Sequence, residues 1–172
     1  MSLTNRFAAG AFAGLLCASI LAAPAAAQTT ATASISAKAS VTGVAPLAAT
    51  GVNDLNFGTV TAGAIGTPSG PANFGRFSVS GQPSTPVTVS FALPTVLHGP
   101  GSATIPISFG SSDGKIWAPY PTTSTSFDPN ASSTQSLDGT GSLIIGITGT
   151  VSPPTLTSTG LYTGTITLTV SY

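Results

Sequence analysis

Apolar and polar residues alternate with a period of two in two stretches of the chain, one near each end. Successive side chains of a β-strand point to opposite faces of a sheet, so this alternation predicts half-buried strands. In the C-terminal stretch, threonine and serine separate apolar and aromatic residues of the kind that suit a pleated surface. We therefore expect a long terminal strand over 162–172, whose inner face consists of Tyr162, Ile166, Leu168, Val170 and Tyr172.

The second alternating stretch covers 31–41, and its apolar face includes Ala33, Ile35, Ala37, Ala39 and Val41. Buried apolar area contributes about 25 cal/mol per Å², so an alanine-rich face gains less than the Ile, Leu and Val of the terminal strand. A long strand with such a thin apolar face is suited to insertion into a groove. Residues 28–45, which contain this stretch, are therefore the candidate for such an inserted strand.

Shorter apolar runs separated by glycine and proline fill the middle of the chain. The expected strands lie in 54–60, 74–79, 87–91, 103–109, 115–117 and 142–151. By contrast, 118–135 is rich in Pro, Ser and Thr with little periodicity, which predicts a long loop. No amphipathic helix is expected after residue 27. About 7–9 short strands with turn residues between them favour an antiparallel β-sandwich over 28–172, as a single all-β domain.

The first 27 residues have the pattern of a secretory signal peptide. Arg6 precedes an apolar run over 7–23, and Ala25-Ala26-Ala27 forms a small-residue cleavage site before Gln28. The alternative is an uncleaved membrane anchor, because the run is nearly long enough to span a bilayer. Pro24 and the small-residue end favour cleavage, which leaves a mature chain without stable membrane insertion.

The remaining chain carries very little charge. Three basic residues stand against four aspartates and no glutamate, so the net charge after cleavage is 3 − 4 = −1. Such a surface has no basic footprint for nucleic acid. Cys17 is the single cysteine and leaves with the signal peptide, so the mature domain has no disulfide. Its length of 172 − 27 = 145 residues is enough for a core to form without one.

Enzymatic chemistry has few candidate residues. His98 is the single histidine and sits in a Pro/Gly turn without an adjacent partner for general-base work. Asp113, Asp128 and Asp138 offer a carboxylate pair in principle, but each stands before Gly or Pro, where aspartate serves turns. We expect no enzymatic activity and no cofactor.

The sequence offers two candidate ligand sites. Residues 128–139 carry oxygen donors at alternate positions, yet they lack the bidentate Glu and the central Gly of a calcium loop, so no metal is expected. Trp117 and Tyr120, beside two prolines, form either an aromatic platform for a sugar ring or packing at the edge of the core. Core packing is the favoured interpretation of these rings.

Three segments together resemble a bacterial pilin-like domain family of uncharacterised function. They are Asp54-Leu-Asn-Phe-Gly-Thr-Val60, Phe77-Ser-Val-Ser-Gly81 and the ending Gly160-Leu-Tyr-Thr-Gly-Thr-Ile-Thr-Leu-Thr-Val-Ser-Tyr172. That family is similar to spore coat protein U domains and, more distantly, to chaperone–usher pilins. The resemblance covers most of the mature chain, and the closing Gly-x-Tyr-x-Gly…Tyr pattern is its most specific part.

The resemblance implies an immunoglobulin-like sandwich that lacks its final strand and accepts one from a neighbour. Residues 31–41 then match the donor strand, and 162–172 match the strand beside the acceptor groove. It also implies an exported surface protein, in the periplasm, on the outer surface or outside the cell, that acts as a pilus-type or coat subunit. The implied partners are copies of itself or related subunits, a periplasmic chaperone and an outer-membrane usher. The alternative is a monomeric surface-binding module that recognises glycans or matrix through its loops.

Overall fold

The chain divides into two units that are described separately. The computed structural model describes residues 35–40, 43–118, 120 and 122–172. Backbone contacts separate a unit over Met1–Ser40 from a unit over Val41–Tyr172. In the first unit, residues 35–40 are exposed and belong to no helix or strand. The signal peptide expected over 1–27 lies outside the described residues.

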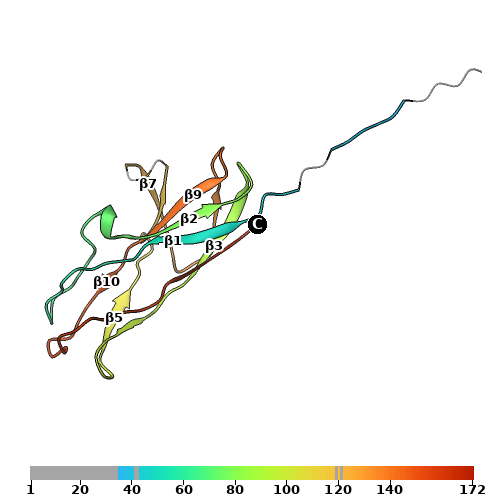
Figure 1. The fold of residues 1–172 in the computed structure, drawn as a ribbon. Helices are drawn as coiled ribbons and strands as arrows, with labels where there is room; N and C mark the ends of the chain where they lie inside the picture. The colour runs from blue at the N-terminus through green and yellow to red at the C-terminus, as the bar shows by residue number, and fades with distance from the viewer. Residues whose placement is uncertain (1–34, 41–42, 119, 121) are drawn as a thin grey trace, which may run out of the picture. The chain divides into compact units, whose positions relative to one another are not determined.

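The second unit is built of antiparallel β-sheets (Figure 1). Its largest sheet has the strand order β1-β2-β9-β6-β7. Strand β1 pairs only with β2 and therefore forms one edge of this sheet. The bounds of the five strands are Ala48–Asn53, Gly75–Ser80, Ser142–Ile147, Gly114–Trp117 and Ser124–Phe127.

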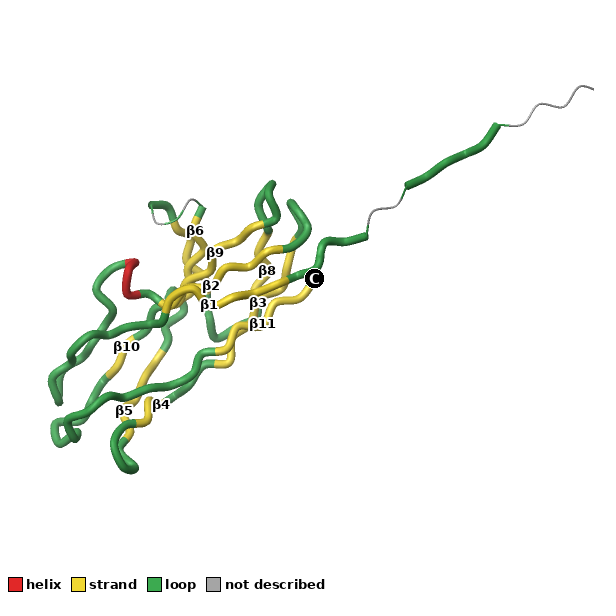
Figure 2. The backbone as a smooth tube through the Cα atoms, viewed as in Figure 1, coloured by secondary structure: helices red, strands yellow, loops and turns green. Residues whose placement is uncertain are grey.

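Two smaller sheets complete the unit (Figure 2). One has the order β11-β3-β8, with bounds Thr167–Ser171, Pro86–Ala92 and Ser133–Ser136. The other has the order β10-β5-β4, with bounds Thr150–Val151, Thr104–Ser108 and Val96–His98. The described residues contain one short 3-10 helix, Pro71–Asn73. Among these residues, no helix has the length and apolar character needed to cross a bilayer.

The main core lies where the five-stranded sheet faces the β11-β3-β8 sheet. Its fully buried residues come from both sheets, because alternate side chains of β2, β3 and β9 turn inward. They are Val79, Val87, Val89, Leu137, Leu143 and Ile145. The predicted all-β class with antiparallel sheets is therefore confirmed, and two sheets that enclose a shared core are consistent with a β-sandwich.

A second cluster of buried residues lies at the other end of the unit. Leu97, Ile105, Ile107 and Val151 form it, and they come from β4, β5 and β10. Half-buried side chains from segments outside the strands pack against this cluster, among them Phe57 and Tyr162. At this end, strands cover the buried cluster only in part, and segments outside the strands cover the rest.

The described residues form eleven strands, where the sequence predicted about 7–9. The expected long loop over 118–135 was wrong, because it contains β7 and most of β8. Both strands lie at sheet edges with largely exposed side chains, so their Ser/Thr-rich sequences carry no apolar alternation. The expected strand over 142–151 is divided after Ile147, because β9 belongs to the five-stranded sheet and β10 pairs with β5 in another sheet.

The terminal strand is shorter than the alternation predicts. Strand β11 begins at Thr167, although the period of two starts at Tyr162. From Gly160 to Ile166 the one paired position is Thr163, which forms an isolated bridge with His98. The side-chain alternation persists through this segment, but its backbone forms a single bridge and no continuous ladder with a neighbouring strand.

Candidate functional site

A large groove lies between two segments of the second unit. One wall is the continuation of β1, over 51–62, and the other is the segment that leads into β11, over 157–166. The groove has a volume of about 1180 Å³. Its floor is apolar and is formed mainly by Leu97, Ile105, Ile107, Ile147 and Val151. The groove thus exposes one side of the second buried cluster.

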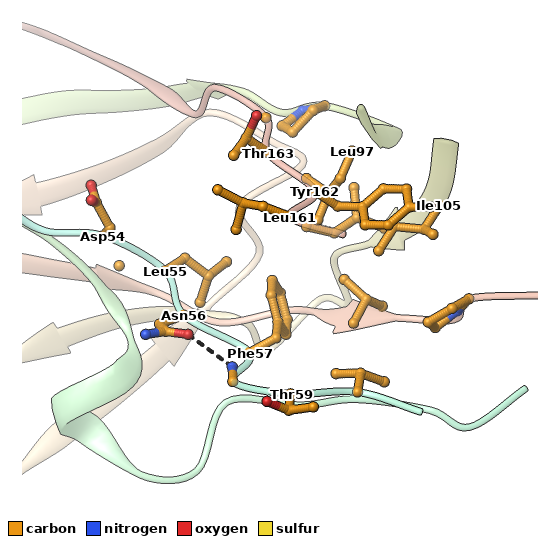
Figure 3. A pocket seen from close by; sticks show the side chains of 18 of the residues that line it. Asp54, Leu55, Asn56, Phe57, Thr59, Leu97, Ile105, Leu161, Tyr162 and Thr163 are labelled. Atoms are coloured by element: carbon orange, nitrogen blue, oxygen red, sulfur yellow. Dashed lines mark hydrogen bonds between the residues drawn. The ribbon is translucent and has the colours of Figure 1, made fainter. Parts of the chain in front are cut away.

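Large side chains project into the groove from both walls. Figure 3 shows Leu55 and Phe57 on one wall facing Leu161 and Tyr162 on the other, with Ile105 nearby. Phe57 and Tyr162 are half-buried, whereas Leu161 is 80% exposed. Leu161 is an exposed apolar side chain in a groove, so a chain segment that covers it would lower the free energy.

The backbone of the first wall is hydrogen-bonded on one side only. The N–H of Asn56 donates to the carbonyl of Asn73, at 2.9 Å. Neighbouring residues of an extended chain direct their backbone groups to opposite sides. Leu55 and Phe57 therefore direct theirs toward the groove, where no backbone partner is found within the described residues.

The second wall repeats this arrangement. Thr163 exchanges both backbone hydrogen bonds with His98, at 2.8 and 2.9 Å, on the side away from the groove. Its neighbours Tyr162 and Gly164 have no backbone partner in the part of the chain that the structure describes. Both walls thus carry backbone groups that are unpaired on the groove side, as at the edge of a sheet, and such backbone is a template for another strand.

The groove is closed at one end. Strands β1 and β11 approach each other there, and the lining begins at Gly51 on one wall and stops at Ile166 on the other. Beyond this point the side chain of Tyr172 reaches the segment that precedes β1, and its hydroxyl donates to the carbonyl of Ala45 at 2.7 Å. The groove therefore lies along 51–62 and 157–166, at the end of the domain away from Tyr172.

The predicted terminal-strand residues are divided between the groove and the core. Tyr162 and Ile166 line the groove. Leu168 and Val170 instead pack half-buried against the main core, and Tyr172 is 51% exposed. Only the N-terminal part of the predicted inner face of the terminal strand therefore lines the groove.

The predicted donor residues fall in the first unit or outside the described residues. Ile35, Ala37 and Ala39 are exposed and lie in no strand, with Ile35 98% exposed. Ala33 and Val41 lie outside the described residues. The donor role of 31–41 stays a prediction.

The aspartates weighed as catalytic candidates each cap a turn. The carboxylate of Asp113 accepts hydrogen bonds from the N–H of Gly110 and from the hydroxyl of Thr148. Asp128 accepts the N–H of Asn130, which holds the pKa of its carboxyl below the usual range. In the described residues no group of three or more His, Cys, Asp or Glu is arranged to hold a metal ion.

Trp117 is part of the packed interior, with 5% of its surface exposed. Its ring stacks on Phe74 at 6.2 Å and meets the edge of Tyr120 at 5.2 Å. The guanidinium of Arg76 lies 4.3 Å from the centre of the Tyr120 ring and donates to its hydroxyl. A sugar platform needs an open ring face, which the buried Trp117 does not offer.

Sequence reasoning missed part of the groove. The alternation of Leu55 and Phe57 was visible, but it indicated an ordinary strand rather than an unpaired wall. The alternation of Ile105 and Ile107 likewise predicted a strand, without showing what lies over it. No local signal marks Leu97 as a floor residue, because its position depends on the pairing of β4 with β5.

Comparison with known proteins adds no family assignment. The chain matches no protein-family model and no curated protein sequence. The geometry of the groove is therefore the basis for a functional proposal.

Proposed function

We propose that this protein is a secreted, non-enzymatic structural subunit of a bacterial surface assembly, of the pilus or coat type. Its groove receives an extended chain segment that pairs with both walls, which is strand addition to exposed sheet edges. The observation that carries the proposal is an apolar groove whose two walls both direct unpaired backbone groups inward. An added strand uses both edges, whereas a small ligand needs neither.

The size of the groove favours a peptide segment as its occupant. Small-molecule pockets usually measure about 300–1,000 Å³, and this groove measures about 1180 Å³. Each wall is one continuous stretch of chain, with twelve residues over 51–62 and ten residues over 157–166. The alternating segment over 31–41 has eleven residues, so its length matches both walls.

The alanine-rich face of 31–41 suits this groove. Leu55, Phe57, Leu161 and Tyr162 already project into the space between the walls (Figure 3). The volume of about 1180 Å³ is the space that these side chains leave, and eleven donor residues share it, so small side chains fit beside the wall residues. Ile35 is the largest side chain of the donor face, so it acts as the anchor on the apolar floor.

The pilin-like, immunoglobulin-like interpretation of the sandwich follows from the same arrangement. An inserted strand would join the β1 edge of one sheet to the β11 edge of the other, as the missing final strand of such a domain does. An uncovered edge beside apolar surface is an aggregation hazard. An exported subunit of this kind therefore needs a periplasmic chaperone until an usher delivers it to the next subunit.

The experiment compares Ile35→Asp with Ser36→Asp in the full chain. If 31–41 docks with its apolar face inward, an aspartate at 35 becomes an unpaired charge in an apolar groove, whereas one at 36 faces solvent. We expect Ile35→Asp to abolish hydrogen-exchange protection of 31–41 and to lower the melting temperature or dissolve assemblies, and Ser36→Asp to leave both unchanged. Equal behaviour of the two variants would overturn the donor role and favour a monomeric binding module.

A further inference from the structure

Two loops outside the groove each expose a large apolar side chain. The loop between β1 and β2 carries Ile65, which is 74% exposed. The loop between β10 and β11 carries Leu156, which is 95% exposed. Neither residue lines the groove. The function proposed for the groove therefore does not explain these two side chains.

The two loops lie side by side at the end of the second unit away from the C-terminus (Figure 1). The N–H of Gly63 donates to the carbonyl of Pro153 at 2.9 Å. Gly66 and Val151 exchange two backbone hydrogen bonds, each of 2.9 Å. The loops are thus joined by backbone hydrogen bonds into one surface. We call this pair of loops, over 61–66 and 153–157, the apolar tip.

The backbone directs both apolar side chains of the tip away from the domain. Gly66 is buried, and a β-carbon there would meet side chains of the second buried cluster. Ile65 is its neighbour in an extended stretch and therefore points to the opposite side. Leu156 lies inside a turn that is closed by the N–H of Thr157, which donates to the carbonyl of Pro154 at 3.1 Å.

Much of the backbone of the apolar tip is hydrogen-bonded within the tip. The N–H of Ala64 donates to the carbonyl of Thr61 at 3.0 Å, in addition to the bonds that join the two loops. Pro153 and Pro154 have no N–H to satisfy. The hydrocarbon of a bilayer offers no partner for backbone groups, so such groups must be bonded within the protein. These bonds lower the cost of moving the tip from water to lipid, and a partner protein would not require them.

The end of the unit that carries the tip lacks acidic and strongly basic side chains. Residues 55–75, 77–112 and 139–172 contain no Asp, Glu, Lys or Arg. They supply both loops of the tip and strands β4, β5 and β10 beside them, where His98 is the single imidazole. Charged side chains are costly to move into lipid, and this tip has none. Its surface therefore matches a bilayer whose headgroups carry no net charge.

We propose that the apolar tip docks on the surface of a lipid bilayer with headgroups of zero net charge. Ile65 and Leu156 enter the boundary between headgroups and acyl chains, where covering their apolar surface is favourable. The contact is peripheral and reversible, because only two loop ends enter the lipid and no segment crosses it. This inference does not depend on what occupies the groove.

The first test measures flotation of the chain that begins at Gln28 with vesicles of phosphatidylcholine. Its intact mass verifies that residues 1–27 are absent, so that the apolar run over 7–23 cannot anchor it. We expect the protein to float with the vesicles equally at low and high salt, because no charge attracts it. Failure to float would overturn the proposal and favour a partner protein as the occupant of the tip. Binding that needs anionic lipid and disappears at high salt would also overturn it.

The second test removes the two apolar side chains together, as Ile65→Ser with Leu156→Ser. Covering one large aliphatic side chain contributes roughly tenfold or more to affinity, so the pair should weaken vesicle binding by about a hundredfold. Ile65→Met with Leu156→Met is the matched control, because it keeps apolar surface at both positions and should bind like the wild type. Equal vesicle binding by the serine variant and the wild type would overturn the proposal.

Two further measurements accompany every variant. The melting temperature should stay at the wild-type value, since substitutions at such exposed positions change folding little. Solution mass is measured before vesicles are added, because an assembly binds a surface more tightly than a single chain. A loss of vesicle binding at unchanged melting temperature and unchanged mass is the result that supports the role of the tip.

Discussion

The indole ring of Trp117 lies against the backbone of Gly146, in the space that a β-carbon at residue 146 would occupy. The two residues belong to the neighbouring strands β6 and β9, and Trp117 pairs directly with Ile144, two residues before Gly146. Both residues are buried. The absence of a side chain at 146 thus leaves the space that the indole ring of Trp117 occupies.

Gly146→Ala should therefore destabilise the fold by forcing Trp117 out of its position. Inserting a methyl group into a well-packed region typically costs about 1–3 kcal/mol. Chemical unfolding followed by tryptophan fluorescence measures the loss and the ring displacement together. Gly139→Ala is the control, because a β-carbon there meets nothing within 4 Å. Similar unfolding free energies for both variants would contradict this packing.

Leu161→Asp should block donor docking and leave the fold intact. Leu161 is 80% exposed, so an aspartate there stays hydrated before docking and changes folding free energy by only about 0.5 kcal/mol. After docking, the same charge would be covered by the donor strand. Leu156→Asp is the control, since Leu156 is 95% exposed and does not line the groove.

The readouts for this pair are thermal unfolding, solution mass and hydrogen exchange of 31–41. Leu161→Asp should lose assembly and protection and melt cooperatively at the temperature of the undocked Ile35→Asp variant, and Leu156→Asp should keep both assembly and protection. Assembly that survives Leu161→Asp would show that this wall is not covered by a partner.

Asp138→Asn should make stability less dependent on acid pH. One carboxylate oxygen of Asp138 accepts the N–H of Ser142 at 2.8 Å and the N–H and hydroxyl of Thr140 at 2.8 and 2.7 Å. These hydrogen bonds, that of Ser142 first, hold the pKa of Asp138 below its usual range. A lowered pKa in the folded state contributes stability above the unfolded value of about 3.9, which is lost as the pH falls through the folded value.

The variant should accordingly melt at a lower temperature than the wild type at neutral pH. The gap between their melting temperatures should close as the pH falls from about 5 toward 2, because the wild-type carboxylate becomes protonated. Melting curves across this range measure the gap. A gap that stays constant with pH would show that the charge of Asp138 does not contribute.

Export should leave a chain that begins at Gln28 or within a residue or two of it. The small residues Ala25-Ala26-Ala27 are the recognised feature of the cleavage site. The intact mass of protein isolated from its native host decides the point. A mass that still includes residues 1–27 would contradict cleavage and favour the membrane-anchor alternative.

The side-chain alternation of the terminal segment could be predicted because it depends on local backbone geometry. Any extended chain places Leu168 and Val170 on one face and Thr169 on the other, whatever its partners. The all-β class follows for the same reason, from many short runs of β-forming residues between glycines and prolines. What alternation cannot show is whether an extended segment has a partner on each side. Strand β11 begins only at Thr167, where its ladder with β3 begins, although the pattern continues back to Tyr162.

By itself, then, the sequence determined the alternation of side chains with a period of two, the low charge and the antiparallel all-β class. Only the tertiary structure decided which edges stay unpaired, since that depends on the order of strands in the sheets. Ala45 and Tyr172 are 127 residues apart, and no local pattern predicts that they meet. The groove has the same origin. Its walls come from the two ends of the domain, and they lie side by side because β1 and β11 are edge strands of sheets that share a core.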